Sequence, residues 1–582
     1  MNSNLSPEDP RAEIAFQVMW SRLIAVVEEQ AQTLVRTAFG TATREAGDLS
    51  AGVYDTGGRM LAQAVTGTPG HVNSMAKSVG HILAKFPLAD MAAGDVYITN
   101  DPWLGTGHLN DIVVVTPAFR DAEPIGLFAC TLHVVDIGGR GITGEARQVF
   151  EEGLRLPVLK LVDRGRMDEA LLEVVQANVR EPVQVIGDIY SEVACNEIGC
   201  RRLLTMLDEY KLANVDALGE RILTRSHAAS LDAIARLPFG TYRNSMTVDG
   251  LEAPIAIHAA LSIGADGIDV DFAGTGGLSR YGINVPLCYT EAYTSFGVKC
   301  IVAPRIPNNA GSLAAIRVRA PEGSILNAPH PVAVQARHIM GQMLPDVVFG
   351  CLRQAIPDGV PAEGSSSLWN VTLMGGVGRV DADPEELLRA TPFNVTSFHS
   401  GGAGARPHQD GLSATAFPSG VRNVPVEITE IVAPVLVRRK EYRMDSGGAG
   451  RQRGGLGQVM EIRSAEAMPF ANAAAFDRVH HPARGAAGGG PGAPGRVARG
   501  SGAVLAGKGH HSIAADDTIV IEMAGGGGYG DPRRREPASV ARDVLNGLVS
   551  VAAARRGYGV VVSAGGTLDA DATRAMRQRE TR

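Results

Sequence analysis

Two apolar runs separated by a short polar segment constrain the fold of the N-terminal part of the chain. The runs span residues 112–115 and 125–132, and the segment between them, residues 117–124, reads PAFRDAEP. Short β-branched and apolar runs on either side of turn-forming residues are typical of two buried strands. The sequence therefore predicts an antiparallel β-hairpin whose loop is centred between residues 120 and 121.

A His-x-x-Asp unit flanks each predicted strand at the open end of the hairpin. One unit runs from His108 to Asp111 before the first strand, and the other from His133 to Asp136 after the second. With this loop centre, His108 is expected opposite His133, and Asp111 opposite Cys130. Two neutral imidazoles and a carboxylate suit Zn²⁺, Mn²⁺ or Fe²⁺, and an open ligand position lets such an ion lower the pKa of a bound water. The alternative is a pair of core histidines beside strand ends.

Composition limits the function classes. A chain of 582 residues is long enough for two or three domains, and its net charge of −7 argues against a nucleic-acid partner, since nucleic-acid binders carry a basic face. Neither a signal-peptide pattern nor an apolar run long enough to span a bilayer is present, so we expect a cytoplasmic protein without a membrane partner. The six cysteines show no Cys-x-x-Cys pair, which favours free thiols, and Cys130 is expected to be a buried small residue rather than a nucleophile.

The distribution of glycine and of apolar periodicity predicts a mixed α+β fold. Amphipathic helices are expected at residues 11–38, at 70–86 and after Pro182, and alternation at residues 268–272 predicts a strand with Asp269 and Asp271 on a solvated face. The chain has 70 glycines, and the clusters that they form lie mainly in the C-terminal third, which favours tight turns and close backbone approaches there. We therefore expect a helix-rich, metal-bearing domain (1–220), a mixed α/β middle domain (221–430) and a Gly-rich β domain (431–582).

Two segments come close to phosphate-binding loops. Residues 502–509, GAVLAGKG, approach a Walker A sequence but place Gly509 where the Mg²⁺-binding Ser or Thr should stand. The loop that begins at Asp136 has Arg140 where sugar-kinase-like ATPases have Thr. Because neither loop is complete, ATP is expected to bind elsewhere or on another chain.

Two polar segments are candidates for substrate binding. Arg337, followed by His338, could hold a substrate carboxylate through its guanidinium fork, although a surface arginine among turn residues is an equal alternative. Arg406 and His408 lie close together on a Gly-rich loop that is a candidate active-site loop. Loops often carry such residues without any function, so an ordinary surface loop is the alternative.

Nine ordered segments along the chain carry a family resemblance. They are REAGDLS (44–50), PGHVNSM (69–75), GDVYITNDP (94–102), GHLNDI (107–112), HVVDIGG (133–139), DFAGT (271–275), DSGGAGR (445–451), RGGLG (453–457) and GGGGYGDP (525–532). With these segments the sequence resembles the hydantoinase B / 5-oxoprolinase family, which includes the metal-binding subunits of ATP-dependent ketone carboxylases. Asn110 and Val134 depart from the family pattern, which often has Pro and His at these two positions.

The resemblance implies a metal site and a partner. It implies that His108, Asp111 and His133 bind one divalent transition metal, with Asp48 as a fourth ligand. His71 or Asp136 would orient the water or a ligand imidazole. The chain would be the B-type subunit of an ATP-dependent cyclic-amide hydrolase of the hydantoinase, N-methylhydantoinase or 5-oxoprolinase type.

In such a hetero-oligomer, ATP is bound by an ATPase-like A-type partner, which phosphorylates a small cyclic amide, and metal-activated water attacks the activated carbon. The alternatives are the metal-binding subunit of an acetone- or acetophenone-type carboxylase, and a scaffold protein that has kept the fold without activity. The intact ligand residues count against the scaffold.

Overall fold

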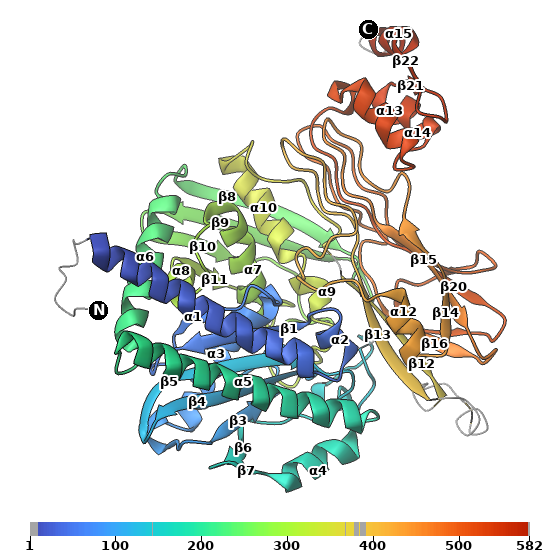
Figure 1. The fold of residues 1–582 in the computed structure, drawn as a ribbon. Coiled ribbons are helices and arrows are strands. Elements are labelled where there is room, and N and C mark those ends of the chain that lie inside the picture. The colour runs from blue at the N-terminus through green and yellow to red at the C-terminus, as the bar shows by residue number, and fades with distance from the viewer. Residues whose placement is uncertain (1–9, 143, 367, 377–382, 384–391, 580–582) are drawn as a thin grey trace.

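The computed structural model describes residues 10–579 except 143, 367, 377–382 and 384–391. Within this part of the chain, helices and mostly antiparallel sheets pack around several hydrophobic cores, which confirms the α+β class (Figure 1). None of the helices in the described residues combines the length and apolarity needed to cross a membrane.

A seven-stranded antiparallel sheet forms the centre of the N-terminal part (Figure 1). In spatial order its strands are β2 (Met60–Gln63), β1 (Leu49–Tyr54), β5 (Glu123–His133), β4 (Asp111–Arg120), β3 (Val96–Thr99), β6 (Leu159–Asp163) and β7 (Arg166–Met167). Helices α1 (Pro10–Thr37) and α5 (Pro182–Tyr210) pack together on one face of the sheet, and α3 (Pro69–Lys85) packs on the other. These three helices confirm the predicted ones to within about two residues at each predicted end.

Helix α3 shows why this layer forms. Pro69 stands in its first turn, where the fixed φ of proline suits a helix start and the missing N–H costs no hydrogen bond. His71, Met75, Val79 and Ile82 are buried at spacings of three or four residues, so they share the helix face that lies on the sheet. His71 is the polar member of this face, and it lies at the end where the helix begins.

The hairpin forms as predicted, but its register differs from the prediction. The turn is only Asp121 and Ala122, with Asp121 at φ 55°, and the two strands continue through both flanking prolines. Both prolines lie beyond the part of each strand that pairs with its outer neighbour, so the absent N–H breaks no bond on that side.

The two-residue turn and a β-bulge between Ala118 and Phe119 together pair His133 with Asp111, and Cys130 with Val114. The predicted pairings of His108 with His133 and of Asp111 with Cys130 are wrong. The thiol of Cys130 is fully buried, its pKa is raised well above the ordinary value by that burial, and all six cysteines are free. The apolar interpretation of Cys130 fits this environment.

A second core follows the N-terminal layer. Its sheet contains, in order, β11 (Ile316–Arg319), β10 (Gly267–Asp271), β9 (Ile255–Gly264) and β8 (Gly240–Val248), with β10 and β11 parallel. The helices of this region are α6 (Asp216–Ile234), α7 (Leu287–Val302), α8 (Ala310–Ala314), α9 (His338–Gly341) and α10 (Leu344–Ala355). Helices α2 (Thr41–Arg44) and α4 (Glu169–Asn178) pack on α1 and α5 of the N-terminal part. Strand β10 confirms the predicted alternation, and Asp269 pairs there with Arg317 at 2.7 Å.

The C-terminal part contains two further sheets. One has the order β13 (Phe393–His399), β12 (Trp369–Gly375), β16 (Phe470–Ala475), β19 (Lys508–Ile513), and the other β14 (Val435–Tyr442), β15 (Gln458–Ser464), β20 (Thr518–Glu522), β17 (Arg496–Arg499), β18 (Val504–Leu505). Helix α12 (Val426–Val432) precedes β14. After the sheets follow α13 (Pro537–Leu545), α14 (Val551–Tyr558), the two-stranded pair of β21 (Val561–Val562) and β22 (Leu568–Asp569), and α15 (Ala570–Arg579). Lys508 is buried against Asp477 at 3.0 Å, so the Walker-like segment forms strands and an ion pair.

Glycine-rich segments run side by side between these sheets and the C-terminal helices (Figure 1). They are joined by backbone hydrogen bonds outside any regular sheet, such as Gly526 N to Gly455 O and Gly455 N to Ala403 O. A Cβ on Gly526 would lie 2.0 Å from Ala403 O, and one on Gly454 would lie 1.9 Å from Gly526 O. The glycines therefore allow backbone to pack directly on backbone, as the sequence predicts.

The cores do not divide the chain as the predicted segments do. The third core joins Trp369 and Val371 of β12 to residues of β15, β16 and β20, although residues 369–375 belong to the predicted middle domain. The boundaries near residues 220 and 430 remain predictions.

We expect Gly526→Ala to destabilise the protein by about 2 kcal/mol or more, because the new methyl group overlaps a backbone carbonyl that cannot move independently. Gly80→Ala is the matched control: a Cβ there meets nothing within 4 Å, and alanine in the interior of α3 should be neutral or stabilising by up to about 1 kcal/mol. Thermal unfolding followed by circular dichroism measures both, and equal melting temperatures for the two variants would contradict backbone-on-backbone packing.

Candidate metal centre

Three polar residues lie in a row across adjacent strands at one end of the seven-stranded sheet. Asp111 begins β4 and pairs with His133 at the end of β5. On the other side of β5, Leu132 pairs with Leu49, and the backbone N–H of His133 donates to the carbonyl of Asp48 at 3.2 Å. Side chains directly opposite each other on antiparallel strands point to the same face, so this row directs Asp48, His133 and Asp111 to the face covered by α3.

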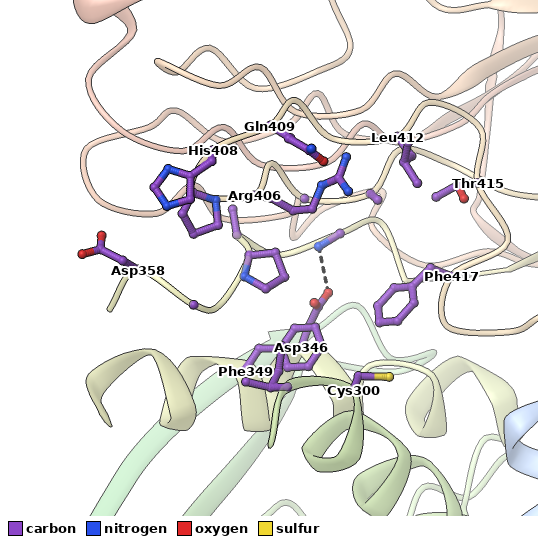
Figure 2. Close-up of a pocket in the computed structure, with 18 residues that line it drawn as sticks. Cys300, Asp346, Phe349, Asp358, Arg406, His408, Gln409, Leu412, Thr415 and Phe417 are labelled. Carbon is purple, nitrogen blue, oxygen red and sulfur yellow. Dashed lines mark hydrogen bonds between the residues drawn. The ribbon is translucent and has the colours of Figure 1, made fainter. Parts of the chain in front are cut away.

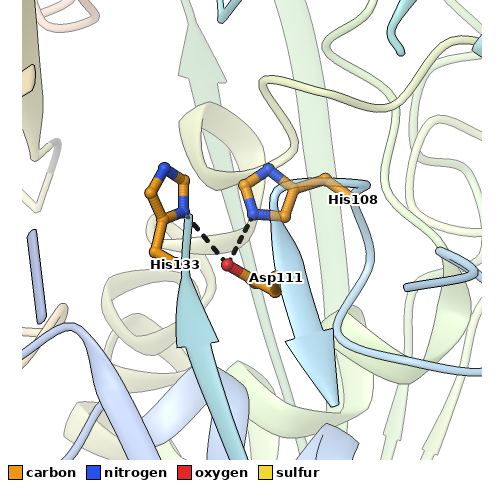
Figure 3. Close-up of side chains that lie close together, drawn as sticks. All are labelled: His108, Asp111 and His133. Carbon is orange, nitrogen blue, oxygen red and sulfur yellow. Dashed lines mark hydrogen bonds and ion pairs between the residues drawn. The ribbon is translucent and has the colours of Figure 1, made fainter. Parts of the chain in front are cut away.

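The carboxylate of Asp111 is the centre of the site. It is fully buried, and its Oδ1 lies 2.8 Å from Nε2 of His108 and 3.0 Å from Nδ1 of His133 (Figure 3). His108 comes from the turn just before β4, three residues ahead of Asp111. One ligand atom from each of these three residues lies within 4.8 Å of the others, and no other such group of three or more His, Cys, Asp or Glu occurs in the described residues.

The second oxygen of Asp111 is held by three donors. Arg337 Nη2 and Thr106 Oγ1 each lie 2.6 Å from Oδ2, and His71 Nε2 lies 3.0 Å from it. The guanidinium of Arg337 rests on the ring of Tyr289 at 4.1 Å and is almost completely buried. These contacts neutralise one side of the carboxylate and leave Oδ1 facing the two imidazoles.

Electrostatics set the protonation of the group. Burial would raise the pKa of Asp111, but the imidazole of His71 and the guanidinium of Arg337, which both bind its far oxygen, hold it well below its ordinary value. Burial and the charge of Arg337 lower the pKa of His108 to about 3. Burial would likewise lower the pKa of His71, but the carboxylates of Asp111 and Asp48 outweigh it and raise that pKa.

The hydrogen bonds of His108 test whether a metal ion fits. Its Nδ1 lies 3.0 Å from the carbonyl of Gln335, an acceptor only, so Nδ1 carries the proton and donates it. Nε2 therefore presents a lone pair, forms no hydrogen bond within the described residues, and faces a carboxylate oxygen at 2.8 Å. Two lone pairs at this distance repel unless a cation lies between them, and a neutral imidazole with its other nitrogen tied to a carbonyl is the usual form of a histidine ligand.

Asp48 lies at the edge of this group. Its Oδ2 is 4.0 Å from His133 Nδ1, its Oδ1 is 3.5 Å from His71 Nδ1, and Thr68 Oγ1 donates to Oδ1 at 3.0 Å. Asp48 as a fourth ligand remains a proposal, which its place in the row supports.

A segment of the second core completes the site from the opposite side. The carbonyl of Gln335 holds His108, and two residues later Arg337 reaches Asp111. The backbone N–H groups of Val334 and Gln335 both donate to Oε1 of Glu152, at 2.7 and 2.8 Å. Burial raises the pKa of this carboxyl to about 8, so it is largely neutral at pH 7.

The other predicted site residues lie elsewhere. The carboxylate of Asp136 binds Arg180 through both of its oxygens. Arg406 and His408 line a separate cavity of about 540 Å³ beside Phe349 and Phe417 (Figure 2).

An aromatic chain separates that cavity from the metal centre. From Tyr289 beneath Arg337, ring contacts of 4.9, 6.4 and 6.0 Å lead through Tyr293 and Phe296 to Phe417 at the cavity. The structure therefore groups His71, Asp48, Arg337 and the three central residues, and it separates Arg406 and His408 from them.

Four residues of the site were not predicted as site residues from the sequence: Thr106, Glu152, Tyr289 and Gln335. Thr106 lies within the glycine-flanked approach to His108, and this nearness was its only signal. The others are far from the hairpin in sequence, and nothing in their local pattern marks them.

Comparison with known proteins gives the family. The family model described as hydantoinase B/oxoprolinase matches residues 12–532, and the chain belongs to this family. A putative B-type subunit of a D-/L-hydantoinase from Pseudomonas sp. (strain NS671) is 26% identical over 606 residues, covering 99% of each chain.

Two solved structures are similar over nearly the whole chain. The ATP-dependent caprolactamase from Pseudomonas jessenii has a TM-score of 0.88 and 26% identity, covering 98% of this chain and 100% of that one. An acetone carboxylase structure has a TM-score of 0.83 at 21% identity, covering 98% and 83%, and it shows the shared fold.

We expect the purified chain to bind about one divalent transition-metal ion, and His108→Ala, His133→Ala and Asp111→Asn to weaken binding by at least 10–100-fold. The alanine variants remove a ligand nitrogen, and Asp111→Asn removes the negative charge that offsets the ion. Elemental analysis and competition with a chelator measure content and affinity. Asp269→Asn, which alters an exposed ion pair on β10, is the control. Equal metal content in all five proteins would rule out this site.

A second expectation concerns Glu152. Since its carboxyl is largely neutral and serves as a hydrogen-bond acceptor, Glu152→Gln should keep the metal affinity within about threefold, whereas Glu152→Ala releases the Gln335 segment and should lower affinity about 10–100-fold. The same chelator competition decides it, and a loss in Glu152→Gln equal to that in Glu152→Ala would contradict the positioning role.

Proposed function

We propose that this chain is the B-type, metal-binding subunit of an ATP-dependent cyclic-amide hydrolase. The observation that carries the proposal is the buried Asp111 carboxylate facing the lone pair of His108, in a chain of the hydantoinase B/oxoprolinase family. Relatives named as a B-type hydantoinase subunit, a caprolactamase beta subunit and a 5-oxoprolinase support the hydrolase class.

The chemistry explains why such an enzyme needs two parts. Amide resonance makes an unstrained lactam carbonyl a poor electrophile, and the ring nitrogen is a poor leaving group. Phosphorylating the carbonyl oxygen makes the carbon electrophilic, and in the proposal ATP bound by an A-type partner supplies the phosphate. After water has added to this carbon, the ring nitrogen takes up a proton and leaves as the amine. An ion bound at the site here would lower the pKa of water to near neutrality and so supply the nucleophile.

The residues of the chain have separate tasks in this proposal. His108, His133 and the Oδ1 atom of Asp111 hold the ion, with Asp48 as the proposed fourth ligand. His71 and Arg337 are positioning residues, since both bind the far oxygen of Asp111 and fix its orientation. Burial of all these side chains limits access by bulk water.

The A-type partner is part of the proposal because the described residues show no complete phosphate loop. Lys508 of the Walker-like segment is committed to Asp477, and Asp136 of the second loop to Arg180. Relatives described as subunits of larger enzymes support a hetero-oligomer.

The second candidate is the equivalent subunit of an ATP-dependent ketone carboxylase. The similarity to acetone carboxylase favours it, but at 21% identity that similarity shows the fold alone. The two candidates differ in the fate of the activated substrate, which reacts with water in one and with carbon dioxide in the other.

We expect the chain alone to hydrolyse neither ATP nor 5-oxoproline, hydantoin or caprolactam. Co-purified with an A-type partner, it should hydrolyse at least one of these rings with ATP consumption, and Asp111→Asn should slow this at least 10–100-fold. Chromatography of ring-opened product and a phosphate-release assay measure the reaction.

The same complex supplied with acetone, ATP and bicarbonate tests the second candidate. Incorporation of labelled bicarbonate without ring opening would replace the hydrolase by a carboxylase. Robust ATP turnover by the chain alone would contradict the assignment of ATP to the partner.

A further inference from the structure

A narrow recess lies directly beside the metal centre. It is lined by Asn110 and Gln335, by residues of the loop that follows β5, and by β12 and β13, including Thr372, Asn394 and Thr396. Its cavity volume is about 20 Å³, enough for one water or one edge of a ligand. Asn110 precedes Asp111, and the carbonyl of Gln335 holds His108, so the recess adjoins the ligand set itself.

The orientation of the Gln335 side chain is fixed by a chain of hydrogen bonds. The carbonyl of Val134 accepts from Asn110 Nδ2 at 3.2 Å, and Asn110 Oδ1 accepts from Gln335 Nε2 at 3.1 Å. Because a backbone carbonyl can only accept, the Asn110 amide must point its NH₂ group at Val134, and the Gln335 amide must then point its NH₂ group at Asn110. Gln335 Oε1 is therefore left without a hydrogen bond among the described residues, although the side chain is only 1% exposed.

A second acceptor without a partner lines the same recess. Asn394 on β13 lies two residues before Thr396, so both side chains share one face of the strand. Its Oδ1 is buried and forms no hydrogen bond within the described part of the chain. Two such acceptors that line one recess can both be satisfied by a single ligand with two N–H donors.

A donor accompanies these two acceptors. Thr372 and Thr396 pair across β12 and β13, with their hydroxyl oxygens 3.0 Å apart. In this pair one hydroxyl donates to the other, so the hydrogen of the accepting hydroxyl is free for a third group. The recess thus offers two amide oxygens and one hydroxyl hydrogen.

We propose that this recess recognises the –NH–CO–NH– edge of a cyclic ureide, of which hydantoin is the simplest probe. The two ring N–H groups would donate to Gln335 Oε1 and Asn394 Oδ1, and the carbonyl between them would accept from the threonine pair. A simple lactam has one N–H and leaves one buried acceptor unpaired. The proposal rests on the proposed function and narrows its substrate class.

The rim of the recess supports entry of a polar ring. Arg180 lies there, held by Asp136 and the carbonyl of Gly139, and so does Arg140, which pairs with Glu151 at 2.9 Å. Asp136 in this arrangement positions a guanidinium at the entrance, where it would attract the electron-rich carbonyl of the ring or a carboxylate substituent.

Binding to the full-length chain tests the proposal without ATP or a partner. Isothermal titration calorimetry with hydantoin, 1-methylhydantoin, 3-methylhydantoin and 2-pyrrolidinone should give the lowest Kd for hydantoin, with loss of either N–H raising Kd on the order of tenfold, since one buried acceptor loses its donor. Equal Kd values across the series, or no binding of hydantoin, would overturn the proposal.

Variants of Asn394 test whether the preference for hydantoin arises in this recess. Asn394→Leu should weaken hydantoin binding about tenfold and leave one of the two methylhydantoins binding as well as hydantoin, while Asn394→Asp, which keeps an acceptor oxygen, should retain the preference. Asn370→Leu is the matched control, because Asn370 lies on β12 of the same sheet with an unpartnered Oδ1 but does not line the recess.

Melting curves check that each variant folds, and the methylated ligands test the wild-type chain if one does not. An unchanged preference in folded Asn394→Leu would overturn the proposal. If the complex hydrolyses cyclic amides but binds hydantoin, the methylhydantoins and 2-pyrrolidinone equally well, this inference is wrong and the proposed function stands. If the chain prefers hydantoin but the complex shows no ATP-dependent hydrolysis, the proposed function is wrong and this inference stands.

Discussion

The buried charge of Asp111 is the constraint around which the N-terminal half is arranged. A carboxylate with no solvent exposure is unfavourable unless hydrogen bonds and opposite charges surround it, and removing one partner of such a pair typically costs about 3–5 kcal/mol. Here the partners come from separate parts of the chain. His108 and Thr106 precede β4, His133 ends β5, His71 begins α3, and Arg337 belongs to the second core.

Because the partners of Asp111 come from two hydrophobic cores, the site forms only when these cores pack against each other. Arg337 can reach Asp111 only if the segment before α9 lies against the end of the hairpin, and Gln335 then meets His108. Glycines make that approach possible, since a Cβ on Gly107 would lie 2.8 Å from the Arg337 side chain, and one on Gly341 would lie 2.3 Å from Tyr289. The site is thus assembled by docking of the cores, and the strand ends alone contribute only half of it.

Features that depend on neighbouring residues could be predicted from the sequence, and features that depend on contacts between distant segments could not. Helices α1, α3 and α5 are set by local periodicity, and here prediction and structure agree closely. Both strands of the hairpin also form, but they extend over most of the segment that was predicted as the loop. The predicted hairpin register is wrong because the turn at Asp121 and Ala122 is centred one residue later than predicted, and a β-bulge between Ala118 and Phe119 shifts the pairing by one more residue. Neither shift is marked in the local sequence pattern. His108, Asp111 and His133 still come together, because a turn of three residues before β4 brings His108 back over the strand end.

The remaining features depend on contacts between distant segments. The glycine clusters predicted close backbone approach, but the whole C-terminal fold decides which segments meet, such as those of Gly526 and Ala403. The place of Arg406 and His408 could not be predicted for the same reason, since a polar loop does not indicate which cavity it lines. Their role in substrate binding stays a prediction.

Gln335 shows how the distant contacts also define chemistry. Its backbone carbonyl fixes which nitrogen of His108 is free, and its side chain, locked by Asn110, presents an acceptor to the adjoining recess. One residue therefore faces the ligand set with its main chain and the recess with its side chain. Any ring bound there is placed by the same residue that orients a metal ligand, so recognition and positioning of the reacting carbon are coupled through a single peptide unit.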